Sequence, residues 1–166
     1  MMGSGKSTVG RLVADALEYD LVDIDSIIEN HAGRSISEIF AVYGEEAFRR
    51  LESAVLADTA NRINLVFATG GGILDSDRNR ELILNSGLVV WLKADANTLV
   101  ERVGEGEGRP MLAGHDLMDR IERLLEARTP DYQQAHLVIE TDQLSESQIV
   151  QEITDYYRSW FTLDEN

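Results

Sequence analysis

A glycine-rich segment at the start of the chain restricts the possible folds more than any other feature of the sequence. Its residues are Gly3, Ser4, Gly5, Lys6, Ser7 and Thr8. The segment matches the G-K-[ST] end of a loop whose backbone N–H groups surround phosphate oxygens, with a lysine near the β- and γ-phosphates and a hydroxyl near Mg²⁺. A helix must follow such a loop, and the apolar spacing of residues 7–19 predicts one. A glycine-rich turn with a chance lysine is the weaker alternative.

The loop motif is incomplete in this sequence. The full pattern has a further glycine five residues before Gly5, a position that precedes Met1. The strand that feeds such a loop, and that is central in the sheet of known folds of this kind, is missing as well. We therefore expect that Met1 is not the natural start and that a short apolar strand ending in glycine is encoded upstream.

The remainder of the chain alternates short apolar strands with helices. Strands are predicted at residues 21–24, 65–68, 88–92 and 137–140. Helices are predicted at residues 7–19, 27–30, 37–60 with a pause at Gly44, 75–85, 97–103, 117–128 and 146–161. This alternation predicts an α/β layer fold with a mainly parallel sheet. A chain of 166 residues without a visible linker is typical of one domain covering residues 1–166.

Two carboxylates lie at the end of the first predicted strand. In an open α/β sheet, ligands bind beyond the carboxyl ends of the strands, which makes Asp23 and Asp25 candidate site residues. Strand alternation would place both side chains on one face, where one could serve a metal and the other a substrate hydroxyl. Alternatively, Asp25 or Ser26 caps the helix at residues 27–30. The residues alone leave both interpretations open.

Three consecutive glycines follow the second predicted strand. Gly70, Gly71 and Gly72 cost conformational entropy, so a run of three is typical of a backbone that approaches a ligand closely. A loose turn is the alternative, but it rarely needs three glycines in a row. Because the triplet and the two aspartates all follow strands, we expect them to meet at one edge of the sheet.

The basic residues are almost all arginines, although the chain carries a net charge of −15. Planar guanidinium groups suit carboxylates and phosphates, so they favour a small anionic substrate. Arg49 and Arg50 lie on one predicted helix, where we expect Arg50 to face solvent. The acidity, which we interpret as a solubilising surface, disfavours nucleic acid as a partner. The lack of cysteines, of a signal peptide and of a long apolar run predicts a cytoplasmic protein without disulfides or a membrane partner.

Two further arginines lie in suggestive surroundings. Arg109 belongs to a glycine-rich segment, residues 104–116, that has the character of a lid bringing a cation to a transferring phosphate. A surface loop is the alternative. Arg128 precedes Pro130, which we expect to end the helix, and taken alone Arg128 would simply complement the helix C-terminus.

Taken in order, these motifs resemble those of the shikimate kinase family. The chain reads GSGKST, DIDSIIE, FRRLE, GGG, RPML and RTPDY. The family pattern has GSGKS[ST], D-x-D-x-x-I-E, F-R-x-x-E, G-G-G, R-P-L-L and R-x-x-x-Y, so the match runs from Gly3 to about Thr141 and departs mainly at Met111. GKST alone indicates only a superfamily, whereas the combination is specific. The resemblance implies a nucleoside-monophosphate-kinase-like P-loop fold and transfer of the γ-phosphate of ATP to the 3-hydroxyl of shikimate.

The resemblance also implies roles on the nucleotide side. Lys6 and the rest of the loop would bind the phosphates of ATP. Ser7 and Asp23 would hold Mg²⁺, Asp23 partly through water. Arg109 would act from the lid near the γ-phosphate, and Arg102 would stack on adenine.

On the acceptor side, the resemblance implies a substrate-binding region at residues 25–60. Asp25 would bind hydroxyls of shikimate and orient or deprotonate the attacking one. Arg49 and Arg128 would bind the carboxylate, and Glu52 would orient Arg49. The backbone N–H groups presented to the substrate would be those of Gly71 and Gly72.

Two other functions are compatible with the sequence. Another small-metabolite kinase, such as gluconate kinase, is the nearest enzymatic alternative, but it has no evident need for paired arginines aimed at a ring carboxylate. A catalytically inactive, P-loop-derived binding protein is supported only by the incomplete first motif. The expected partners are ATP and shikimate, bound by a monomer with Mg²⁺ as cofactor.

Overall fold

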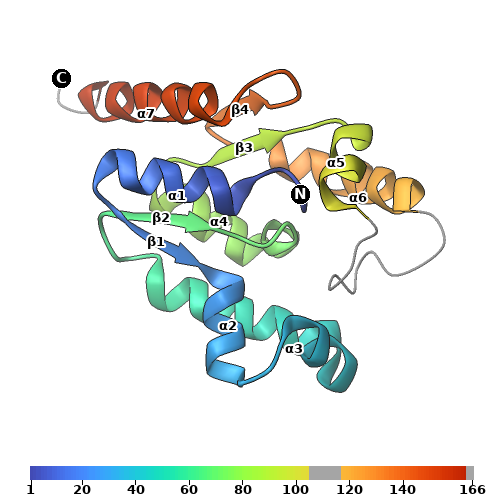
Figure 1. Ribbon diagram of the computed structural model, residues 1–166. Helices are drawn as coiled ribbons and strands as arrows, with labels where there is room; N and C mark the ends of the chain where they lie inside the picture. The colour runs from blue at the N-terminus through green and yellow to red at the C-terminus, as the bar shows by residue number, and fades with distance from the viewer. Residues whose placement is uncertain (105–116, 164–166) are drawn as a thin grey trace.

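The computed structural model describes residues 1–104 and 117–163 and has the α/β architecture expected from the sequence (Figure 1). The strands are β1 (Asp20–Asp23), β2 (Leu65–Ala68), β3 (Val90–Lys93) and β4 (Leu137–Glu140). The helices are α1 (Lys6–Leu17), α2 (Ile24–Ala32), α3 (Ile36–Thr59), α4 (Asp77–Ser86), α5 (Ala96–Val103), α6 (Leu117–Tyr132) and α7 (Glu146–Leu163), with a 3₁₀ turn η1 (Ile73–Asp75). Among the described residues, no helix is long and apolar enough to cross a bilayer. Arg109 and all of the predicted lid except Gly104 lie outside the described residues.

The strands pair in parallel, as predicted, but the described residues form two two-stranded sheets in place of one larger sheet. One sheet consists of β1 and β2, and the other consists of β3 and β4. Asp23 pairs with Ala68, so the carboxyl ends of β1 and β2 lie side by side. This register brings the motifs that follow the two strands to one edge, as expected. The further strand ahead of Met1 stays a prediction.

The loop ahead of α1 depends on glycine at two positions. Gly3 and Gly5 have φ values of 73° and 86°, a region that other L-residues rarely adopt. Gly5 is the N-cap of α1, so the loop leads directly into the positive end of a 12-residue helix. Val9 and Val13 of this helix pack against apolar side chains of β3, β4 and α7, which fixes the loop relative to the sheet.

The helix after β1 begins earlier than expected. α2 starts at Ile24, directly after the strand, and Asp23 is its N-cap, with Oδ1 accepting a hydrogen bond from the backbone N–H of Ser26 at 3.2 Å. The alternative interpretation, that Asp25 or Ser26 caps a helix at residues 27–30, is therefore wrong. Asp25 lies in the first turn of α2, where the helix N-terminus favours its negative charge. Because Asp25 is not part of the strand, the expectation that strand alternation places it on the same face as Asp23 is wrong.

α3 is interrupted by Gly44, at the position where the sequence predicted a pause. Gly44 has φ 78° and ψ 172°, a conformation that is essentially restricted to glycine. Ser35 and Glu38 form a capping box at the start of this helix. Phe48 and Glu52, in the half that follows Gly44, are buried. The break therefore lets one continuous segment change direction before it delivers two buried side chains to the site.

α6 continues through Pro130 to Tyr132, so the prediction that Pro130 ends the helix is wrong. The fixed φ of proline suits a helix, and because Pro130 lies two residues before the end of α6, the helix loses only the hydrogen bond that this N–H would have donated to the Glu126 carbonyl. Arg128 and Tyr132 are four residues apart, and because the helix continues to Tyr132 their side chains share one face of α6. Both are buried, with exposed fractions of 5% and 6%.

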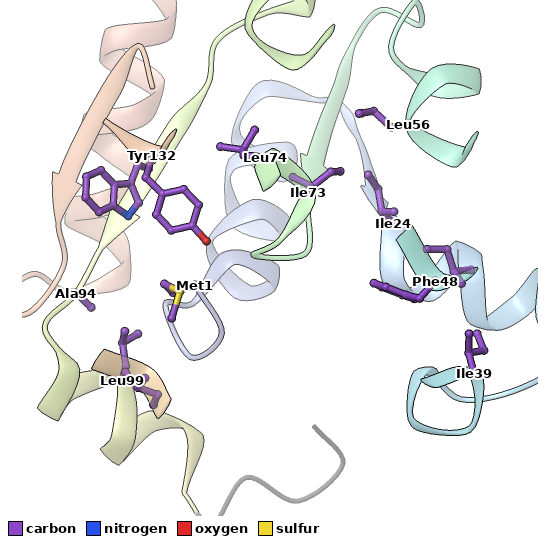
Figure 2. Close-up of a cluster of buried hydrophobic side chains, with 13 residues drawn as sticks. Met1, Ile24, Ile39, Phe48, Leu56, Ile73, Leu74, Ala94, Leu99 and Tyr132 are labelled. Atoms are coloured by element: carbon purple, nitrogen blue, oxygen red, sulfur yellow. The ribbon is translucent and has the colours of Figure 1, made fainter. Parts of the chain in front are cut away.

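The larger of two apolar clusters in the described residues supports the helices that carry the site (Figure 2). It joins side chains of α2, α3, η1, α5 and α6 with Met1. Aromatic pairs lie within it: the rings of Phe40 and Phe48 are 5.0 Å apart, and those of Trp91 and Tyr132 are 5.4 Å apart. Residues from separate parts of the chain are thereby held in fixed relative positions.

Candidate active site

A cleft of about 780 Å³ opens where the phosphate loop, the carboxyl ends of β1 and β2, and helices α3 and α6 meet. Every predicted site residue in the described part of the chain lines it. These residues are Gly3, Ser4, Gly5, Lys6, Ser7, Thr8, Asp23, Asp25, Arg49, Gly71, Gly72, Arg102 and Arg128. Arg109 is the exception, because it lies outside the described residues. The structure therefore brings together motifs that are spread over more than a hundred residues of sequence.

The phosphate loop holds its own lysine close to the backbone. Lys6 Nζ donates a hydrogen bond to the Met1 carbonyl and lies 3.5 Å from Ser4 Oγ. Ser4 Oγ donates to the same carbonyl at 2.8 Å. The ammonium group is thus placed beside the positive end of α1, an arrangement that attracts the negative charge of a phosphate chain.

Ser7 and Asp23 converge from different elements, sixteen residues apart in sequence. Ser7 Oγ, in the first turn of α1, donates a hydrogen bond to Asp23 Oδ2 at 3.2 Å. A hydroxyl and a carboxylate are the hard oxygen ligands that Mg²⁺ prefers, so the pair fits such an ion. Within the described residues, no group of three or more His, Cys, Asp or Glu side chains could hold a metal. An ion bound here would therefore complete its coordination with water and phosphate oxygens.

Glu52 is a buried carboxylate beside the acceptor end of the cleft. Its side chain is 0% exposed, and Oε2 accepts a hydrogen bond from Arg49 Nη1 at 2.8 Å. Burial raises the pKa of Glu52, Arg49 opposes this, and the negative charges of Asp25 and Asp75 raise the pKa further. A Cβ on Gly70 would lie 2.6 Å from Glu52 Oε1 and 3.5 Å from Asp25 Oδ1, so a larger residue at the first triplet position would displace the Glu52 carboxylate.

Arg49 is oriented by its neighbours on α3. Nη1 pairs with Glu52 and Nη2 pairs with Glu45 at 3.0 Å, while the guanidinium carbon lies 5.4 Å from the centre of the Phe48 ring. Burial lowers the pKa of Arg49, but the hydrogen bonds and charges of the two glutamates outweigh it and the pKa is raised. The expected contact between Glu52 and Arg49 is therefore present. Arg50, in contrast, is exposed and pairs with Glu46, as predicted.

The guanidinium groups of Arg49 and Arg128 both lie beside the glycine triplet. Arg128 Nη2 pairs with Asp75 Oδ2 at 3.1 Å. A Cβ on Gly71 would lie 3.2 Å from Arg128 Nη1, and a Cβ on Gly72 would lie 2.6 Å from Arg49 Nη1. Adjacent glycines are thus flanked by guanidinium groups from α6 and α3. This arrangement can bind a carboxylate at two points while backbone N–H groups contact the same ligand.

Arg102 lies at the opposite end of the cleft. In the last turn of α5, its Nη1 and Nη2 donate to the side-chain and backbone oxygens of Thr141, each at 3.2 Å. Thr141 is fully buried, so the guanidinium is held against the end of β4. A Cβ on Gly3 would lie 3.7 Å from Arg102 Cβ, which places this arginine beside the phosphate loop.

Sequence reasoning missed several residues at the site. Asp75, which pairs with Arg128, follows the triplet without any motif of its own. Tyr132 belongs to the RTPDY motif, yet only its arginine was given a role. Ile36 and Phe40 line an apolar part of the cleft, and their helical spacing is indistinguishable from that of ordinary core residues.

Comparisons with known proteins agree with one another. A family model described as "Shikimate kinase" matches residues 2–158. The shikimate kinase of Symbiobacterium thermophilum is 45% identical over 93% of this chain and 91% of the relative, and that of Gloeobacter violaceus is 51% identical over 81% of this chain and 76% of the relative. Among solved structures, shikimate kinase from Acinetobacter baumannii in complex with shikimate has a TM-score of 0.91 at 36% identity, covering 95% of this chain and 89% of that one. The enzyme from Aquifex aeolicus has a TM-score of 0.81 at 32% identity, covering 93% and 90%.

Proposed function

The chain belongs to the shikimate kinase family and is an ATP-dependent enzyme that phosphorylates shikimate, and we propose that it does so in the cleft between the phosphate loop and the glycine triplet. One observation carries this proposal. Arg49 and Arg128 flank adjacent glycines at one end of the cleft, and the phosphate loop forms the other. The gluconate kinase and inactive-protein alternatives are not favoured, because the family resemblance extends through the acceptor motifs.

At the acceptor end, the carboxylate of shikimate would be bound by both arginines. Glu52 and Asp75 hold these guanidinium groups in place before the substrate arrives, which reduces the entropy lost on binding. The N–H groups of Gly71 and Gly72 would contact the same substrate. The ring would then lie beside the apolar wall of the cleft, with its hydroxyls near α2.

Asp25 would bind the 3-hydroxyl of shikimate and orient or deprotonate it. Its position supports this role, because it lies in the first turn of α2, next to the strand end that faces the phosphate loop. Phosphoryl transfer depends chiefly on alignment and on neutralising charge, so an aspartate that aligns the attacking oxygen suits the reaction. The proton of the hydroxyl would pass to the Asp25 carboxylate as its oxygen bonds to the γ-phosphorus and the bond from that phosphorus to the β–γ bridging oxygen breaks, which releases ADP.

At the nucleotide end, the loop from Gly3 to Thr8 would surround the phosphates of ATP, with Lys6 beside the β- and γ-phosphates. Ser7 and Asp23 would hold Mg²⁺, which when bound neutralises phosphate charge. Arg102 would pack on the adenine ring. Arg109, outside the described residues, would bring a further positive charge to the γ-phosphate from a lid at residues 104–116.

We also propose that residues 1–166 form one kinase domain with its substrate-binding region at residues 25–60, and that it works as a cytoplasmic monomer. Both substrates are small metabolites, and the net charge of −15 would repel nucleic acid. Sedimentation at several protein concentrations would test the monomer, and a concentration-dependent mass would contradict it.

A coupled ADP-release assay tests the function directly. The purified chain is supplied with ATP, Mg²⁺ and either shikimate, gluconate or no acceptor. We expect ADP release that depends on shikimate alone. Equal release with gluconate would indicate a broader metabolite kinase, and release that ignores the acceptor, or none at all, would contradict the proposal.

A further inference from the structure

The hydroxyl group of Tyr132 has no role in the proposed function, although it lies among residues that would bind shikimate. Its ring is buried in the apolar cluster that also contains Met1 and Leu74 (Figure 2). The ring also packs against that of Trp91, with the ring centres 5.4 Å apart. The hydroxyl donates a hydrogen bond to the Gly71 carbonyl at 2.6 Å. Burial raises the pKa of Tyr132 to about 12, so the hydroxyl keeps its proton and remains a donor at neutral pH.

This hydrogen bond fixes the orientation of one peptide unit. All described peptide bonds are trans, so the carbonyl of Gly71 and the N–H of Gly72 point in opposite directions. Holding the carbonyl on Tyr132 therefore turns the Gly72 N–H away from α6. Within the described part of the chain, neither Gly71 nor Gly72 donates its N–H to another protein group. Glycine backbones rotate easily, so this peptide unit needs an external anchor.

The same hydroxyl also interacts with Arg128. The charge and hydrogen bond of Arg128 oppose the effect of burial on the pKa of Tyr132. A Cβ on Gly71 would lie 3.2 Å from both Arg128 Nη1 and Tyr132 Oη, which shows how closely the three groups approach. The second guanidinium nitrogen, Nη2, is held by Asp75. Tyr132 thus connects the backbone of the triplet to an arginine that Asp75 fixes from the other side.

We propose that Tyr132 is a positioning residue that holds the Gly71–Gly72 peptide unit and the Arg128 guanidinium in one arrangement for the acceptor. This inference rests on the proposed function, because the acceptor that this arrangement would bind is shikimate. Tyr132 acts through its neighbours, because it is not among the residues that line the cleft. Loss of its hydroxyl should therefore weaken binding of the acceptor and leave binding of ATP unchanged.

Tyr132→Phe tests the proposal, because it removes the hydroxyl and keeps the ring in the core. We expect the KM for shikimate to rise about five- to tenfold, the factor that one hydrogen bond typically contributes, with the KM for ATP unchanged. The matched control is Tyr156→Phe, which removes a tyrosine hydroxyl bonded to the His136 carbonyl at 3.2 Å, away from the cleft. We expect the control to alter the melting temperature only.

A second variant approaches the same contact from the opposite side. Gly71→Ala places a methyl group against Arg128 and Tyr132, and it should raise the KM for shikimate even if Tyr132→Phe fails to fold. In a double-mutant cycle, the rise in the KM for shikimate of the double variant should be smaller than the product of the two single rises, because both changes disrupt one arrangement. An unchanged KM for shikimate in folded Tyr132→Phe, or equal rises for both substrates, would overturn the inference. A wild-type enzyme without shikimate-dependent turnover would instead overturn the proposed function.

Discussion

The two ends of the cleft are built by different means. The nucleotide end consists mainly of backbone: two glycines with positive φ lead into the N-terminus of α1, and the Ser7 side chain is exposed. The acceptor end consists of ion pairs. Arg49 pairs with the buried Glu52 within α3, whereas Arg128 and Asp75 belong to separate elements and are 53 residues apart. A short run of residues can therefore specify the first end, whereas the second forms only when α3, η1 and α6 pack together.

This difference predicts that damage to one end leaves the other intact. A change at the acceptor end should affect the KM for shikimate, whereas a change at the nucleotide end should affect the KM for ATP. Asp25, beside Gly70 and Glu52, would take part in the reaction itself and should affect turnover. Each variant below therefore asks whether the two ends are as separable as their construction suggests.

The largest effect is expected for Asp25→Asn. The amide keeps the shape of the carboxylate but cannot take the proton of the attacking hydroxyl, so kcat should fall about a hundredfold or more. Binding of ATP, measured by titration, should persist. Asp20→Asn, at the start of β1, the strand that precedes α2, changes an exposed aspartate; it is the control and should behave as the wild type. Near-normal turnover of Asp25→Asn would remove Asp25 from the chemistry.

The next largest effect is expected for Arg128→Lys and Arg49→Lys. A lysine offers one point of charge where the guanidinium offers two parallel donors, so the KM for shikimate should rise about tenfold or more, with little change for ATP. Arg128 should be the more sensitive, because its side chain is 6% exposed against 25% for Arg49. Steady-state kinetics with each substrate varied would measure both effects.

Arg50→Lys provides the control for both arginines. Arg50 lies next to Arg49 in sequence, but its side chain is 68% exposed and pairs only with exposed Glu46 in the described residues. Its replacement should leave both KM values unchanged. If Arg128→Lys and Arg49→Lys raised the KM values for shikimate and ATP equally, these arginines would hold the fold together and would not be specific to the acceptor.

The contrast between the ends also explains what the sequence could predict. The phosphate loop, the break at Gly44 and the strands at residues 65–68 and 137–140 follow from local rules, and the structure agrees with them. Asp75 could not be found, because a lone aspartate becomes a partner of Arg128 only through packing. Pro130 was misjudged for a related reason. Its local tendency to end a helix is overridden where the rest of α6 is held by the core.

Two glycine replacements compare the ends directly, with smaller effects. Gly70→Ala should raise the KM for shikimate, because its Cβ would lie 2.6 Å from the buried Glu52 Oε1. Gly5→Ala has space, with its nearest neighbour 3.8 Å away, but its φ of 86° is strained for alanine by about 1–2 kcal/mol. It should raise the KM for ATP instead. If both variants changed the KM values for shikimate and ATP in the same way, the two ends of the cleft would be coupled.

The smallest effect concerns the buried carboxylate of Glu52 and its dependence on pH. Burial raises its pKa above the ordinary 4.5, and the charges of Asp25 and Asp75 add to the rise that Arg49 opposes. A carboxyl whose folded pKa is raised favours the folded state most when it is protonated. Its contribution to stability is therefore present below the unfolded pKa and is lost as the pH rises through the folded pKa.

Glu52→Gln should remove this dependence, because the amide does not titrate. The melting temperature of Glu52→Gln minus that of the wild type should increase as the pH rises above about 4.5, and then level off once the folded carboxyl is ionised. Glu46→Gln is the control, since Glu46 is 89% exposed and its difference from the wild type should stay flat. A difference for Glu52→Gln that decreases with pH would mean that the ion pair with Arg49 outweighs burial. The acceptor end would then be stabilised by its charges and not merely positioned by them.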